Sequence, residues 1–180
     1  MPTGNGITAD TPVNLTIGAG VMIKDHAYVG ATVDNNLFAV ERTMFVPDLN
    51  GIMWDLQGTA YITRSIPRIE ATVPEVGQSV MSSALPGVTV DTGTAGQVLI
   101  SDSGTRRVPD SDYHDYELDV ERVNGGQIQF EVDNAINTGS FQGELQDDGL
   151  FAPRWVLTGH GTASAPSTSP WRIRILTTAS

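Results

Sequence analysis

The chain has 180 residues, no cysteine and a formal net charge of −11. Its length suits a single domain with one core, and the lack of cysteine excludes disulfides, thiolate metal sites and a cysteine nucleophile. The acidic balance, with Lys24 as the only lysine, argues against a cationic surface for nucleic acids. No segment approaches the ~20 apolar residues of a membrane helix and no signal-like pattern opens the chain, so we expect a protein made and used in the cytosol, with no membrane partner.

The chain opens with a polar segment and then a strand. Residues 1–12 are polar and glycine-rich, which predicts an amino-terminal arm followed by one β domain over 13–180. Apolar residues alternate with polar ones from residue 13 and predict a strand over 13–23. Gly18 and Gly20 lie within this strand, which indicates a bulge or a close backbone approach.

The next elements are predicted to be three strands and the only helix. The first strand is expected at 37–42 and is followed by a loop over 43–53. Clean alternation predicts a half-buried strand over 54–62 and another over 68–73, in which Ile62 and Ile69 face the core. Proline, an early glutamate and apolar residues four apart predict a helix over 74–84, ended by a Pro-Gly pair.

The middle of the chain carries the strongest hairpin pattern. Short strands are expected around 88–90 and 97–100. Alternation over 116–121 and 128–133, joined by an Asn-Gly-Gly turn, then predicts a β-hairpin with one apolar face.

The other face of this hairpin concentrates negative charge. Between Asp110 and Asp148 there are eleven acidic residues and one base, Arg122, so this segment holds −10 of the net −11. Like charges opposed across strands cost roughly 0.2–1 kcal/mol per pair, so the face is either a solvated surface or a surface that repels something negative. The carboxylates expected on this acidic face are those of Glu117, Asp119, Glu121, Glu131 and Asp133.

The last part of the chain is predicted to add three strands. Two of them are expected at 141–145 and 154–158, before a low-complexity loop over 159–170. Alternation from Trp171 to Ile175 predicts a closing strand.

Motifs for catalysis or cofactor binding are missing from the sequence. There is no G-x-S-x-G string, no phosphate loop, and no pair of histidines at metal-binding spacing. The segment 110–115 resembles a calcium loop, with Glu121 at its twelfth position, but Asp115 stands where such loops need glycine. We therefore expect no enzyme activity, no cofactor and no metal site.

The first half of the chain resembles the tail tube, or major tail, proteins of long-tailed bacteriophages. The resemblance covers roughly residues 10–90. It rests on the order of these segments: VNLTIGAGV (13–21), VGAT (29–32), LFAVER (37–42), DLQGTAY (55–61), IPRIEA (66–71) and ALPG (84–87).

This resemblance implies a fold, a role and partners. The fold would be a β-sandwich or barrel with one short flanking helix. The subunit would assemble with itself into stacked, usually hexameric, rings that form a hollow tube for genome delivery. Its partners would be copies of itself, the tape measure, tail tip and terminator proteins, and DNA that passes without specific binding. The tube would be built in the host cytoplasm and reside in the virion tail, with the five carboxylates facing an acidic lumen.

Two other functions remain open from the sequence. The first is a soluble β-sandwich binding module, such as a carbohydrate-binding or receptor-binding virion domain, for which Trp54, Trp155 and Trp171 would supply a stacking platform. Their places in alternating strands favour core positions instead. The second is a hydrolase with converging carboxylates, for which no particular pair stands out.

Overall fold

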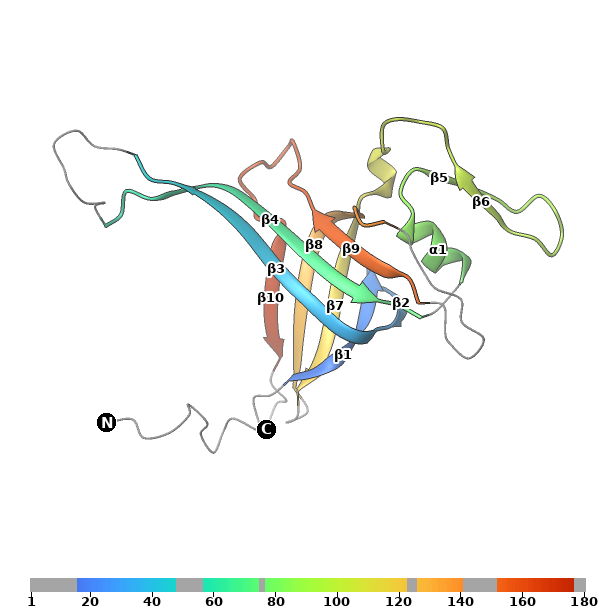
Figure 1. The fold of residues 1–180 in the computed structure, drawn as a ribbon, viewed down its shortest axis with the longest axis horizontal. Coiled ribbons are helices and arrows are strands. Elements are labelled where there is room, and N and C mark those ends of the chain that lie inside the picture. Colours follow the sequence, from blue (N-terminus) through green and yellow to red (C-terminus); the bar gives the residue numbers. More distant parts are fainter. Residues whose placement is uncertain (1–15, 48–56, 75–76, 123–125, 141–151, 177–180) are drawn as a thin grey trace.

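The computed structural model describes residues 16–47, 57–74, 77–122, 126–140 and 152–176 (Figure 1). Ten strands and one α-helix follow in chain order within these ranges. They are β1 (Thr16–Lys24), β2 (Ala27–Ala31), β3 (Val33–Phe45), β4 (Tyr61–Thr72), α1 (Gln78–Ala84), β5 (Val88–Asp91), β6 (Leu99–Asp102), β7 (His114–Arg122), β8 (Gln127–Asn137), β9 (Arg154–Gly159) and β10 (Trp171–Leu176). A short 3-10 helix, η2 (Asp110–Asp112), precedes β7.

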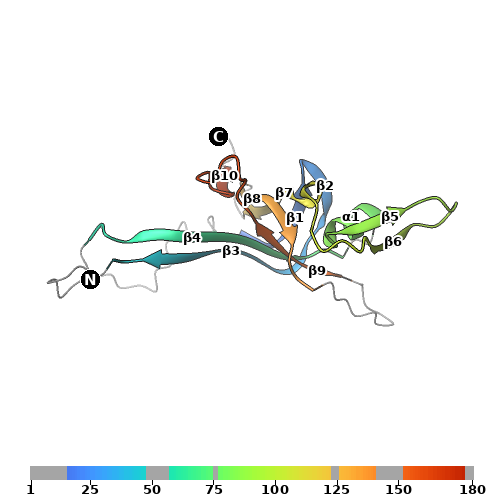
Figure 2. The same cartoon turned by 90° about the horizontal axis from the view of Figure 1, so that it is seen from above.

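Eight strands form one antiparallel sheet that folds over itself. Its order is β2-β1-β7-β8-β9-β4-β3, and β10 pairs with β8 as a branch. The long strand β8 is shared, because its residues 127–132 pair with β10 and its residues 135–137 pair with β9. The two views show β3, β4 and β9 crossing the layer made by β1, β7, β8 and β10 (Figures 1 and 2). The mainly β fold with one short α-helix is as predicted.

The core lies between these two layers. Side chains from both layers are buried, and α1 closes one end of the core with Val80 and Ala84. Fully burying an aliphatic or aromatic side chain contributes about 1.5–3 kcal/mol, so this cluster supplies the main stabilising term. Its other members are Met22, Ile69, Ala71, Val73, Tyr116, Leu118, Val120, Val132, Ala135, Trp155 and Leu157.

Gly20 confirms the prediction made for the glycines of the first strand. The register between β1 and β7 shifts between Thr16 and Gly20. A Cβ atom at Gly20 would lie 2.5 Å from the carbonyl oxygen of Asp119, so no larger residue fits without moving the backbone. Both the irregular register and the close approach are therefore present here.

Three predicted boundaries are wrong. The loop expected from residue 43 begins later, because β3 continues to Phe45. Residues 57–60 do not form the expected strand, and the single strand β4 over Tyr61–Thr72 joins the end of the strand expected at 54–62 to the one expected at 68–73. Ile62, expected in the core, is exposed on β4. The helix begins at Gln78 and not at residue 74, because Gly77 holds an extended backbone with φ −104° and ψ 163°.

The remaining strand predictions are confirmed where the structure describes the chain. The hairpin of β7 and β8 and the strands β5, β9 and β10 form at the predicted places, while β6 begins two residues later than the strand expected at 97–100. The loop predicted over 159–170 separates β9 from β10. The predicted arm at 1–12, the strand at 141–145 and Trp54 lie outside the described residues.

Candidate functional site

The five predicted carboxylates lie on one side of the β7–β8 hairpin, opposite the core. Tyr116, Leu118 and Val120 point into the core, so the residues that alternate with them face outward. Glu117 stands directly across from Glu131 in the antiparallel register. The set Glu117, Asp119, Glu121, Glu131 and Asp133, together with the arginines of β10 described next, is called the charged face.

Two arginines of β10 partly neutralise the charged face. Arg172 donates from Nε to Oε2 of Glu131 at 2.7 Å and from Nη2 to Oδ1 of Asp133 at 2.7 Å. Arg174 forms an ion pair with Glu131, its Nε lying 2.8 Å from Oε1, and donates a hydrogen bond from Nη2 to Oε2 at 3.3 Å. The Glu131 side chain is 7% exposed, which suits a carboxylate that forms ion pairs with two arginines.

The charged face is less negative than the sequence analysis indicated, because the five carboxylates share it with two arginines. Five carboxylates and two guanidinium groups leave a formal charge of −3. The alternation of arginines in the closing strand was visible in the sequence. Its pairing with β8 was not, because about forty residues of chain separate Glu131 from Arg172.

Glu117 is the least favourably placed carboxylate on the charged face. Its pKa is raised from 4.5 to about 7, first by burial and then by the neighbouring Asp119 and Glu131 carboxylates. The side-chain amide of Gln129 donates both to Oε1 of Glu117 at 2.6 Å and to Oδ2 of Asp119 at 3.3 Å. One amide thus holds two carboxyl groups close together, and a proton on one of them relieves their repulsion.

The pKa of Asp133, which lies at the other end of the charged face, is also raised. Burial raises its pKa, and the Arg172 guanidinium opposes that rise. Glu121, by contrast, is exposed at the end of β7. The face therefore combines carboxyl groups that can take up protons with fixed guanidinium groups, and it presents a net negative surface at neutral pH.

A second feature is the arm formed by the outer ends of β3 and β4, residues 43–46 and 61–63, which projects away from the core (Figures 1 and 2). The two strands remain paired out to Phe45 and Tyr61. Four large apolar side chains on this arm are exposed: Met44 at 64%, Phe45 at 57%, Tyr61 at 61% and Ile62 at 56%. Apolar side chains gathered on a projection are typical of an interaction surface.

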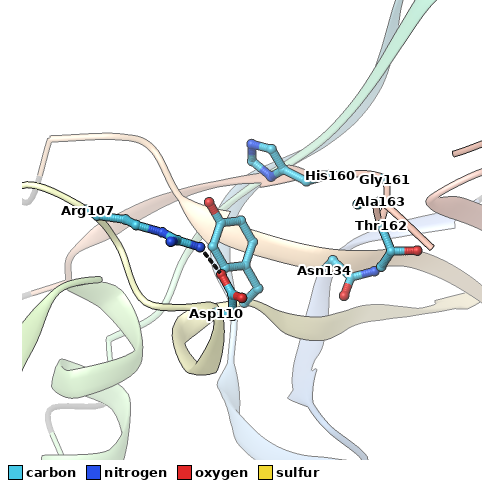
Figure 3. Close-up of a pocket in the computed structure, with 8 residues that line it drawn as sticks. Arg107, Asp110, Asn134, His160, Gly161, Thr162 and Ala163 are labelled. Carbon is cyan, nitrogen blue, oxygen red and sulfur yellow. Dashed lines mark hydrogen bonds and ion pairs between the residues drawn. The ribbon is translucent and has the colours of Figure 1, made fainter. Parts of the chain in front are cut away.

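A third feature is a hollow of about 480 Å³ between η2, β8 and the loop after β9 (Figure 3). Arg107 and Asp110 form an ion pair at 3.1 Å on one side of it. The rings of Tyr113 and His160 meet edge to face with centroids 5.3 Å apart. The remaining lining residues are Asn134, Gly161, Thr162 and Ala163.

The structure separates the residues that the sequence offered as metal ligands. Asp112 accepts a hydrogen bond from the backbone of Gly87 at 2.6 Å, while Asp115 accepts one from the backbone of Asn134 at 2.9 Å. His114 pairs with Asp25 at 2.7 Å. Among the described residues, no group of three histidine or acidic side chains could hold a metal ion.

The tryptophans that the structure describes do not form a platform. Trp155 is completely buried in the core. Trp171 lies against Phe38 at 6.0 Å and beneath the guanidinium carbon of Arg42 at 5.6 Å. Both residues serve packing, as their places in alternating strands indicated.

No model of a known protein family matches the chain, and no curated protein is significantly similar to it in sequence. Where the structure describes the chain, none of its helices has the length and apolar character needed to cross a membrane.

Proposed function

We propose that this chain is a structural subunit that assembles with copies of itself into stacked rings, which form the hollow tube of a bacteriophage tail. The function is non-enzymatic, and the tube conducts the genome. The β-rich fold and its apolar projection support this proposal, together with the resemblance of residues 10–90 to tail tube proteins.

The observation that carries the proposal is the apolar arm of β3 and β4. A two-stranded ribbon is at best marginally stable in water by itself, and this one also exposes four large apolar side chains. A neighbouring subunit that covers the arm would bury those side chains and rigidify the ribbon. A contact of this kind joins unlike surfaces of two copies, and repeating it produces a ring or an open filament.

The strand β10 offers a second surface for assembly. Among the described residues it pairs with β8 alone, so its other edge presents backbone groups without strand partners. Ile173, Ile175 and Leu176 on this strand are exposed. Proteins seldom leave an apolar edge strand open, because it invites pairing with another chain. In an assembled ring this edge would be covered.

The charged face suits the wall of a DNA channel in this proposal. Its formal charge of −3 has the same sign as the phosphate backbone, which suppresses adsorption of DNA to the wall. The arginine pairs anchor the Glu131 and Asp133 side chains on this face.

The experiment is sedimentation velocity over a concentration series with a variant of the arm. Met44→Ser with Ile62→Ser removes two exposed apolar side chains and leaves the core unchanged. We expect the wild type to form large species and the variant to stay smaller at equal concentration. Thr43→Ser with Thr63→Ser is the matched control on the same strands and should assemble like the wild type. Equal assembly of all three proteins would show that the exposed apolar side chains of the arm do not contribute to self-assembly.

A further inference from the structure

The wall of the hollow in Figure 3 contains a β-bulge. Between the cross-strand pairs His114 with Ala135 and Tyr116 with Val132, β7 has one residue and β8 has two. Asn134 is one of these two residues and has φ of 47°, which is unusual for a residue other than glycine. Its backbone N–H donates to Oδ1 of Asp115 at 2.9 Å, so a side chain of β7 holds the bulged backbone of β8. Bulges of this kind redirect a side chain at functional sites.

The hollow gathers polar groups that are free to bind a ligand. The side-chain amide of Asn134 and the hydroxyls of Tyr113 and Thr162 make no hydrogen bond to another described residue. Each of these groups both donates and accepts hydrogen bonds. Nδ1 of His160 is shielded from water, so a ligand would meet the other edge of that ring.

The charges around the hollow select the class of ligand. Arg107 and Asp110 pair with each other, so the lining has no net charge and favours neither an anion nor a cation. The volume of about 480 Å³ lies within the range of small-molecule sites, roughly 300–1,000 Å³. Groups that donate and accept, beside aromatic rings, match the alternating hydroxyl groups and apolar C–H faces of a sugar.

From this combination we infer that the hollow binds a neutral saccharide. Asn134 and Thr162 exchange hydrogen bonds with its hydroxyls, and Tyr113 contacts its C–H face. The residues that line the hollow are different from those of the arm and of the charged face. A sugar-bearing partner, such as a glycan on a cell surface, is the kind of molecule that it would engage.

The test is saturation-transfer difference NMR of the purified chain with glucose, galactose, mannose and N-acetylglucosamine. Glucose 6-phosphate and glucosamine serve as charged comparators. We expect at least one neutral sugar to bind with a dissociation constant of about 1 mM and to exceed both charged comparators. Asn134→Gly keeps the left-handed backbone, which glycine adopts freely, and should weaken binding about tenfold through loss of the amide.

A matched pair of threonine variants separates the site from the loop that carries it. Thr162→Ala should weaken binding, whereas Thr168→Ala in the same loop should leave it unchanged. Circular dichroism of each variant confirms that its fold is retained. The inference is overturned if no neutral sugar gives a signal, if a charged comparator binds more tightly, or if binding survives both Asn134→Gly and Thr162→Ala.

Discussion

Replacing Glu117 with glutamine should make the protein more stable at alkaline pH. In the folded chain, burial and the charges of Asp119 and Glu131 raise the Glu117 pKa from 4.5 to about 7. Between these two values the folded state holds a proton that the unfolded state has released. The wild type therefore loses stability as pH rises through this window, and the loss is complete above pH 7. Glutamine carries no charge at any pH, so the variant does not lose this contribution.

The structure also sets the size of the effect. A shift from 4.5 to about 7 would be worth roughly 3.4 kcal/mol for a fully buried group, at about 1.4 kcal/mol per pKa unit. Glu117 is partly exposed, and solvent screening reduces this to about 1–2 kcal/mol. The Glu117→Gln side chain keeps an oxygen that accepts the 2.6 Å hydrogen bond from Gln129, so the local packing is conserved.

The assay is urea unfolding from pH 5 to pH 8 at constant ionic strength and at a concentration where the chain is monomeric. The stability of Glu117→Gln relative to wild type should rise with pH and reach its full value by pH 8. Glu121→Gln is the control, because Glu121 lies on the same face of the same strand but is exposed. Parallel stability curves for wild type and Glu117→Gln would show that the Glu117 pKa is not raised in the folded chain.

Three further predictions concern contacts that hold the layers together. Gly159→Ala would place a methyl group 2.3 Å from its nearest neighbour and should cost about 1–3 kcal/mol in thermal unfolding, whereas Gly161→Ala, with open space around it, should not. Asn137→Ala should cost about 1–3 kcal/mol and speed hydrogen exchange in α1, because its buried amide donates to the last carbonyl of that helix at 2.7 Å. Arg172→Gln leaves the buried Glu131 with Arg174 as its remaining ion-pair partner and should cost about 1–3 kcal/mol in urea unfolding, and a loss no larger than that of an exposed arginine would contradict the pairing.

Elements with a clean alternation could be predicted from the sequence. The β7–β8 hairpin formed as expected because a period of two and an Asn-Gly-Gly turn act on neighbouring residues. Those same local patterns placed the five carboxylates on one face. What the sequence could not show was the length of β4, where Ile62 alternates like a core residue but lies on the arm beyond the second layer.

Local sequence patterns also could not predict contacts between segments that are far apart in the chain. The turn at Asp25 and His26 places both residues at positive φ, although neither is glycine. Asp25 stabilises this turn through β7, accepting from the backbone of Asp115 at 3.0 Å and from His114 at 2.7 Å. The bulge at Asn134 and the arginine pairs of β10 likewise depend on strand pairing across the sheet. Periodicity shows which face of its own strand a residue occupies, but not which distant strand pairs with it.

The proposed role in a tail tube is tested most directly by electron microscopy of the purified wild-type chain across a concentration series at neutral pH. This role predicts rings with a central hole, or hollow tubes, that become more abundant with concentration. A chain that remains a single 19.2 kDa subunit at every concentration would contradict it.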